Sequence, residues 1–285
     1  MKVGENNMKK IIALTLAISI ALVGAVGCSV KPLEQVTGEA QVQTPKATVI
    51  KVGATPIPHA ELLNFVKPLL EKENIKLEII EFQDYVQPNT ALVDKELDAN
   101  FFQHQPYLDS FNKEKNQNLV SAGSVHVEPL GLYSKGLKNI SELKDSAVIA
   151  IPNDPSNASR ALLLLQSNGI LKLKDEGSIT STEKDIVENP KNLKIILAEA
   201  AQLPRVLDDV DAAVINTNYA LPAKLNPVKD ALIIEGKDSP YANNVVVRSG
   251  DQERPEIEKL VEVLNSPEVK KFIEDKYQGA VVPAF

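Results

Sequence analysis

The chain has 285 residues, of which 44% are hydrophobic and 24% charged, a balance typical of soluble globular proteins rather than of disordered or membrane-embedded ones. Its formal net charge is −7, and the lack of a block of lysines and arginines argues against nucleic acid as a partner. The single cysteine, Cys28, excludes an internal disulfide, a CxxC redox pair and a multi-cysteine metal site.

The first 27 residues have the pattern of an export signal. Lys9 and Lys10 precede an apolar run over 11–26, which is short for a membrane-spanning helix. The stretch 25–28, Ala-Val-Gly-Cys, resembles the lipobox of bacterial lipoproteins, in which the cysteine is acylated and becomes the first residue of the mature chain. We therefore expect a signal peptide over 1–27, a lipidated Cys28, a flexible linker over 28–47 and a lipid anchor at the extracytoplasmic face of the cell membrane. The alternative is an uncleaved helical anchor.

From Thr48 onward, segments with strand and helix patterns alternate. Strands are predicted over 49–52, 76–82, 99–102, 147–151, 193–197 and 211–215. Helices are predicted over 62–70, 88–97, 106–116, 158–168, 255–264 and 267–277, the first of which should kink or end at Pro68. This order implies an α/β fold with mostly parallel sheets. The length favours two lobes, 48–131 with 242–285 and 132–241, joined by a hinge of two chain crossings over 120–133 and 239–245.

No common catalytic motif is present. The sequence has no GxSxG elbow, Walker A loop, GxGxxG or HExxH motif, so we expect no catalysis and no cofactor. The three histidines, His59, His104 and His126, are far apart in the sequence, and each alone is more often a packed or capping residue than a ligand. A metal site made of these histidines and one carboxylate is the alternative.

Arg160 has an unusual position in the sequence. The predicted strand 147–151 is followed by a turn-rich loop in which Ser156 or Asn157 can cap a helix, and Arg160 would then lie in the first turn of that helix. A cation there opposes the helix dipole unless an anion binds at the same place. The pattern thus indicates a carboxylate site, the alternative being a surface arginine paired with Asp154 or with solvent.

Aromatic and amide side chains gather in three further stretches. Residues 82–111 hold six of the thirteen Phe and Tyr residues, and Tyr85, His104 and Tyr107 fall at loop or helix-start positions, where such side chains commonly line a pocket. The strand 211–215 ends in polar residues, and two asparagines follow the second predicted crossing; amides can hold both an ammonium and a carboxylate. These amides are Asn216, Asn218, Asn243 and Asn244. A packed core for the aromatic residues, and turn or cap roles for the asparagines, are the alternatives.

Together these segments resemble the methionine-binding lipoproteins of ABC importers, the MetQ or NlpA family. The matching stretches are 53–61, 99–108, 153–160, 213–217 and 239–241. The resemblance implies a type II periplasmic-binding-protein fold, in which two α/β lobes close over methionine in the cleft. It places Tyr85, Phe102, His104 and Tyr107 around the thioether chain, Arg160 at the carboxylate, and Asn216 and Asn243 at the polar end. Asn218 or Asn244 could take the place of its neighbouring asparagine, and Glu128 could either bind the ammonium group or help to fix the hinge.

We therefore expect an extracytoplasmic lipoprotein that captures methionine and delivers it to the permease of an ABC importer. One alternative is a surface adhesin, which would need the same anchor but no internal pocket. Others are a binding protein for another small amino acid, a methionine peptide or a metal, and a hydrolase, which would need a nucleophile and base that the sequence does not show.

Overall fold

The computed structural model describes residues 47–175, 178–236 and 239–285. The predicted signal peptide, Cys28 and all of the predicted linker except its last residue lie outside these ranges. Within them, every helix is too short or too polar to span a bilayer.

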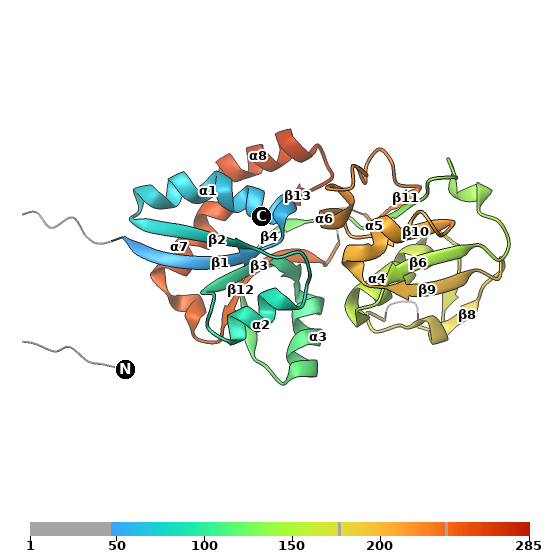
Figure 1. Ribbon diagram of the computed structural model, residues 1–285, viewed down its shortest axis with the longest axis horizontal. Coiled ribbons are helices and arrows are strands. Elements are labelled where there is room, and N and C mark those ends of the chain that lie inside the picture. The colour runs from blue at the N-terminus through green and yellow to red at the C-terminus, as the bar shows by residue number, and fades with distance from the viewer. Residues whose placement is uncertain (1–46, 176–177, 237–238) are drawn as a thin grey trace, which may run out of the picture. The chain divides into compact units, whose positions relative to one another are not determined.

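The first of two main sheets has six strands in the order β13-β4-β12-β3-β1-β2 (Figure 1). β1 pairs in parallel with β2 and β3, whereas β12 runs antiparallel between β3 and β4. The strands are β1 (Thr48–Ala54), β2 (Ile75–Glu81), β3 (Ala99–His104), β4 (Leu119–Val127), β12 (Ala242–Arg248) and β13 (Val282–Pro283). Two strands from the C-terminal part of the chain thus complete a sheet begun by the N-terminal part.

Helices from both ends of the chain pack on this first sheet. They are α1 (Glu61–Lys72), α2 (Gln87–Val93), α3 (Gln105–Lys115), α7 (Pro255–Leu264) and α8 (Pro267–Tyr277), and a short helical segment, Pro56–Ala60, precedes α1. Leu62, Leu63, Val66 and Leu70 of α1 are buried in the same hydrophobic cluster as residues of β1, α7 and α8. This packed face holds α1 together through Pro68, so the predicted end of the helix at Pro68 is wrong.

The second sheet has five strands in the order β11-β5-β10-β6-β9 and its own hydrophobic clusters. Its strands are β5 (Gly131–Tyr133), β6 (Val148–Pro152), β9 (Lys194–Ala198), β10 (Ala212–Ile215) and β11 (Ile233–Ile234). The helices in this part are α4 (Pro155–Ser167), α5 (Leu203–Val206) and α6 (Thr217–Ala220), and β7 (Lys172–Leu173) and β8 (Ile186–Glu188) form a separate ribbon. Single 3₁₀ turns lie at Ile140–Glu142, Glu183–Asp185, Ala200–Gln202 and Asp251–Glu253.

The predicted α/β fold is confirmed, but three details differ from the sequence prediction. Both sheets are mixed rather than mostly parallel, since β5 and β12 enter them antiparallel. The first half of the predicted crossing 120–133, as far as Val127, instead belongs to β4, because its backbone pairs with β12. The chain therefore leaves the first sheet only after Val127 and joins the second at Gly131, and it returns between Ile234 and Ala242.

Candidate ligand-binding site

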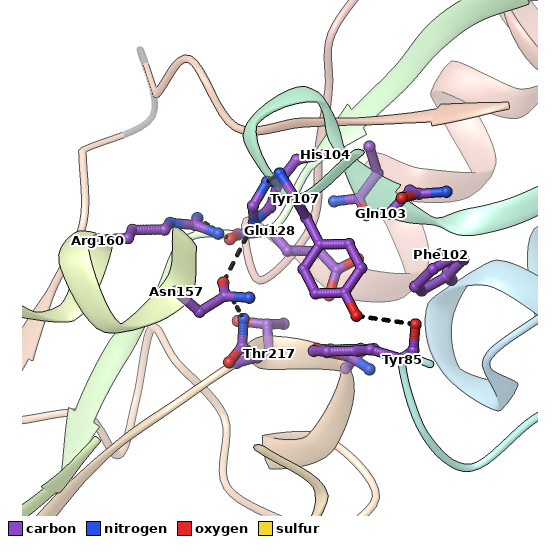
Figure 2. A pocket seen from close by; sticks show the side chains of 12 residues that line it. Tyr85, Phe102, Gln103, His104, Tyr107, Glu128, Asn157, Arg160 and Thr217 are labelled. Atoms are coloured by element: carbon purple, nitrogen blue, oxygen red, sulfur yellow. Dashed lines mark hydrogen bonds between the residues drawn. The ribbon is translucent and has the colours of Figure 1, made fainter. Parts of the chain in front are cut away.

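A small pocket lies where elements of the two sheets meet (Figure 2). The first lobe contributes Tyr85 from the loop before α2, Phe102, Gln103 and His104 from β3, Tyr107 from α3 and Asn243 from β12, and the crossing segment after β4 contributes Glu128. Asn157, Arg160, Asn216, Thr217 and Asn218 come from α4 and from the end of β10 with α6. All seven side chains predicted from the sequence to bind a ligand thus line one pocket.

The wall from the first sheet is largely aromatic. The ring centroid of Tyr85 lies 5.6 Å from that of Tyr107 and 5.8 Å from that of Phe102. The Tyr107 hydroxyl donates to the Tyr85 backbone carbonyl at 2.9 Å. Tyr85 also contacts the ring of Tyr219 at 5.0 Å. Such a set of rings surrounds an extended apolar chain and can contact a thioether favourably.

His104 connects this wall to the opposite one. It caps α3, where its Nδ1 accepts the Tyr107 backbone N–H at 3.2 Å, so the proton of the neutral ring is on Nε2. That Nε2 lies 3.2 Å from Asn157 Oδ1 and donates to it. Burial lowers the pKa of His104 to about 3, and the charge of Arg160 acts in the same direction. His104 is therefore a neutral donor at ordinary pH.

Two asparagine side chains in the pocket keep an unused hydrogen-bonding atom. Asn216 Nδ2 donates to Asn157 Oδ1 at 2.9 Å, and the buried Asn216 Oδ1 has no partner among the described residues. Asn218 Oδ1 accepts the Tyr85 hydroxyl at 2.5 Å, and its buried Nδ2 is likewise without a partner there. Because buried polar groups are normally satisfied, this free acceptor and free donor indicate a polar ligand in the pocket.

Arg160 is 3% exposed, so the alternative of a surface arginine is wrong. Its Nε donates to Glu235 Oε1 at 3.0 Å, its Nη2 forms a short contact to Glu235 Oε2, and Nη2 also donates to the Glu128 carbonyl at 2.8 Å. Nη1 takes part in none of these bonds. The guanidinium also lies 4.3 Å from the ring centroid of Tyr241. The partner of Arg160 is thus Glu235 rather than Asp154.

The sequence pattern predicts Arg160 in the first turn of its helix, and this prediction is wrong. Asp154 caps α4 by accepting the Asn157 backbone N–H at 2.9 Å, so the helix begins at Pro155 and Arg160 lies in its second turn. The helix dipole therefore gives no reason for an anion to bind at Arg160. The burial of Arg160 in the pocket wall still supports a carboxylate site there.

Glu128 lies between two histidines at the back of the pocket. Its Oε1 is 3.2 Å from His59 Nε2 and 2.9 Å from His126 Nε2, and His59 Nε2 is 3.1 Å from Asn243 Oδ1. The three groups have ligand atoms within 4.8 Å of one another, the kind of set that can hold a metal ion. His104 is not in this set. His126 Nδ1 has no partner in the described part of the chain, whereas metal-bound histidines usually have one.

Three lining residues had not been singled out as ligand contacts from the sequence. The sequence pattern suggests only a capping role for Asn157, and it gives no separate signal for Gln103 and Thr217, although both lie in the stretches that match the family. Gln103 is held by its Nε2, which donates to Asn89 at 2.6 Å and to Asn100 at 2.9 Å. Asn244 does not line the pocket, and its Oδ1 accepts the Ser124 hydroxyl at 2.7 Å.

Comparison with known proteins places the chain in a family. The sequence pattern of the NlpA lipoproteins matches residues 50–285. The chain belongs to the NlpA lipoprotein family. Outer membrane lipoprotein 2 of Mannheimia haemolytica is 43% identical over 277 residues, which cover 97% of this chain and 99% of that relative. The D-methionine-binding lipoprotein MetQ of Salmonella typhi is 48% identical over 214 residues, or 74% of this chain and 79% of MetQ.

Solved structures agree with the family assignment. A nutrient-binding protein from Burkholderia cenocepacia, solved bound to methionine, is 52% identical and has a TM-score of 0.80, covering 83% of this chain and 100% of that one. The expected type II periplasmic-binding-protein fold with two α/β lobes is thereby confirmed. NlpA lipoproteins are substrate-binding proteins of the extracytoplasmic face, so the pocket described above is the expected place for a substrate.

Proposed function

We propose that this protein binds methionine in the pocket between its lobes and delivers it to the permease of an ABC importer. The observation that carries the proposal is the pair of unsatisfied buried atoms, Asn216 Oδ1 and Asn218 Nδ2, beside Glu128 and Arg160. The free acceptor and the Glu128 carboxylate complement the ammonium group of a free amino acid. The free donor and the Arg160 guanidinium complement its carboxylate.

The aromatic wall of the pocket matches the chemistry of the methionine side chain. Phe102, Tyr85 and Tyr107 offer ring faces and edges to a four-atom apolar chain that contains sulfur. Relatives and structural neighbours named for methionine binding support the same ligand. In this proposal the protein releases its ligand unchanged and carries out no catalysis. The two sheets support lobe boundaries near residues 131 and 242.

Titration calorimetry with a panel of amino acids tests the ligand. L-methionine and D-methionine are both measured on protein freed of bound ligand by unfolding and refolding. Norleucine, which lacks sulfur, should bind more weakly than methionine by about 0.3–1.5 kcal/mol. Alanine should lose about 2 kcal/mol or more, at about 0.8 kcal/mol for each buried methylene-sized group. Equal affinity for alanine or glutamate would reject methionine as the ligand.

We also propose that Cys28 carries the lipid that keeps the protein at the membrane. The lipobox-like stretch 25–28 and membership in a lipoprotein family support this. Cys28→Ser should move the protein from the membrane fraction to the soluble fraction, because the remaining chain would have no acyl groups. Equal retention of the serine variant after a wash that removes peripheral proteins would instead indicate a helical anchor.

A further inference from the structure

His59, His126 and Glu128 form a buried group at the back of the pocket, and of the three only Glu128 lines it. The side chains are 1%, 0% and 6% exposed, respectively. They come from three separate segments: the short helix before α1, the end of β4 and the crossing segment that follows β4. Both imidazoles direct Nε2 at the same carboxylate oxygen, Glu128 Oε1, at 3.2 and 2.9 Å.

The hydrogen bonds determine where the imidazole protons are. His59 Nε2 faces two oxygen acceptors, Glu128 Oε1 and Asn243 Oδ1, so it carries the proton, and His59 Nδ1 accepts the Thr55 hydroxyl at 2.7 Å. His126 Nε2 meets the same Oε1, and a proton on Nε2 rather than on the unpartnered Nδ1 gives that proton an acceptor. Burial lowers the pKa of His59 to about 4 and that of His126 to about 3. Both rings are therefore neutral N–H donors.

Neutral donors can hold the Glu128 carboxylate in place without neutralising its charge, which is then free to interact with a group in the pocket. Glu128 lines the pocket, and burial raises its pKa, which favours the uncharged acid. Two N–H donors on Oε1 stabilise the ionised form, and because they carry no charge themselves they leave the negative charge of Glu128 uncancelled. Arg160 bonds to the Glu235 carboxylate and only to the backbone carbonyl of Glu128, so the Glu128 carboxylate remains available to a cationic group in the pocket.

We infer that His59 and His126 are positioning residues, which hold the Glu128 carboxylate in place as the counter-charge for the ammonium group of the bound amino acid. The inference rests on the proposed function. It separates the pocket into a part that recognises the amino group, behind which the histidines stand, and a part that recognises the side chain, formed by the aromatic wall. Substitution of the histidines should therefore leave the affinity for a ligand without an amino group almost unchanged.

The test compares two ligands on matched variants. His126→Leu removes the donor, whereas His126→Gln keeps an N–H near the position of Nε2. Calorimetry is run with L-methionine and with 4-(methylsulfanyl)butanoate, which is methionine without its amino group. We expect His126→Leu to weaken methionine binding by about 10- to 100-fold, the effect of one hydrogen bond to a charged group. The des-amino acid should change by less than about threefold, and His126→Gln should restore most of the methionine affinity.

A second measurement shows whether His126 acts through Glu128. In a Glu128→Gln background, His126→Leu should cause no further loss of methionine affinity, because the charge that it positions is already gone. If His126→Leu does not fold, His126→Asn serves in its place, since its shorter amide does not reach Oε1. Melting temperatures of the ligand-free variants identify the folded ones.

Any one of four outcomes would overturn the inference. One is an equal loss for methionine and the des-amino acid, which would make His126 a purely structural residue. Another is that His126→Leu lowers methionine affinity as much in the Glu128→Gln background as in the wild type. The third is tight binding of Zn²⁺ to the wild-type protein that His126→Leu abolishes, which would make the histidines metal ligands. If the wild-type protein bound neither ligand, the proposed function itself would fail, whereas normal methionine binding by His126→Leu would reject only the inference.

Discussion

Side chains in the pocket divide into those whose hydrogen bonds are complete and those with an atom to spare. His104 and Asn157 are satisfied by each other and by their helices, and so they hold the walls in place. Among the described residues, Asn216 keeps a free acceptor and Asn218 a free donor, and Nη1 of Arg160 takes no part in the bonds to Glu235 and Glu128. A zwitterion is the simplest ligand that matches both kinds.

Substitution of Arg160 tests its part in carboxylate binding. Arg160→Ala should weaken methionine binding by about 2–5 kcal/mol, because a desolvated carboxylate would lose its charged partner. The methionine affinity of Arg160→Lys should lie between those of the wild type and Arg160→Ala, since lysine keeps the charge but lacks the planar guanidinium fork. Calorimetry gives the dissociation constants, and Arg205→Ala, an exposed arginine on α5, is the control. An unchanged constant for Arg160→Ala would remove Arg160 from the site.

The buried histidines predict that the ligand-free protein loses stability in mild acid. The pKa of His126 is about 3 in the folded protein, against an ordinary value of 6.5, so the unfolded chain binds the proton first as the pH falls. The free energy of unfolding should therefore decrease below pH 6.5, by up to about 1.4 kcal/mol per pH unit for each such histidine. Glu128 and Asp154, whose pKa values burial raises, act in the opposite direction.

His126→Gln isolates this contribution. Urea unfolding of the variant and the wild type at several pH values between 5 and 6.5 should show a slope that is shallower by up to about 1.4 kcal/mol per pH unit in the variant. Glu128 and Asp154 are present in both proteins, so their opposing contributions largely cancel in the comparison. Identical slopes would mean that His126 titrates normally in the folded protein.

At the scale of single residues, the segments that form the pocket were predictable from the sequence, but which amide side chains point into it was not. The clustered aromatic residues and the buried-strand ending at Asn216 identified the right segments. Whether Asn243 or Asn244 points into the pocket depends on the pleat and on a register shift between these two residues in β12, which the sequence does not show. Gln103 was missed because its role depends on Asn89 and Asn100, which lie on the neighbouring helix and the same strand.

At the scale of secondary-structure elements, the helices α7 and α8 have the predicted bounds because proline starts each one and their apolar faces repeat regularly. α2 ends at Val93, before the predicted Leu97, since the chain turns through a positive φ of 63° at Lys95. The antiparallel entry of β12 was not predictable, because it depends on where the chain returns from the second lobe rather than on any local pattern.

The contact between β4 and α7 provides a prediction about packing. A Cβ atom at Gly123 would lie 2.4 Å from Val261 Cγ1 of α7, so the helix can approach the strand this closely only over a glycine. Gly123→Ala should destabilise the protein by about 1–3 kcal/mol, the usual effect of overpacking. Urea unfolding measures the loss. Val261→Ala should recover part of it in the double variant, and an additive double variant would contradict a direct clash.

At the scale of the whole described structure, direct hydrogen bonds join the two lobes across the pocket. The Tyr85 hydroxyl donates to Asn218 at 2.5 Å, Tyr219 donates to the Gln83 carbonyl at 3.3 Å, and His104 donates to Asn157 at 3.2 Å. These bonds hold the lobes together through protein groups alone. Ligand affinity should therefore depend on how stable this closed arrangement is, as well as on direct contacts.

Tyr85→Phe and Tyr107→Phe form a matched pair that tests closure. The Tyr85 hydroxyl bonds across the pocket, whereas the Tyr107 hydroxyl bonds to the Tyr85 carbonyl within the first lobe. Loss of one bond between the lobes, worth about 0.5–1.5 kcal/mol, should shift ligand-free Tyr85→Phe toward an open form. Small-angle X-ray scattering should then give a larger radius of gyration for ligand-free Tyr85→Phe than for Tyr107→Phe or the wild type. Saturating methionine should bring all three to one value, because a ligand that contacts both lobes favours closure. Equal radii without ligand would show that the Tyr85–Asn218 bond does not control the lobes.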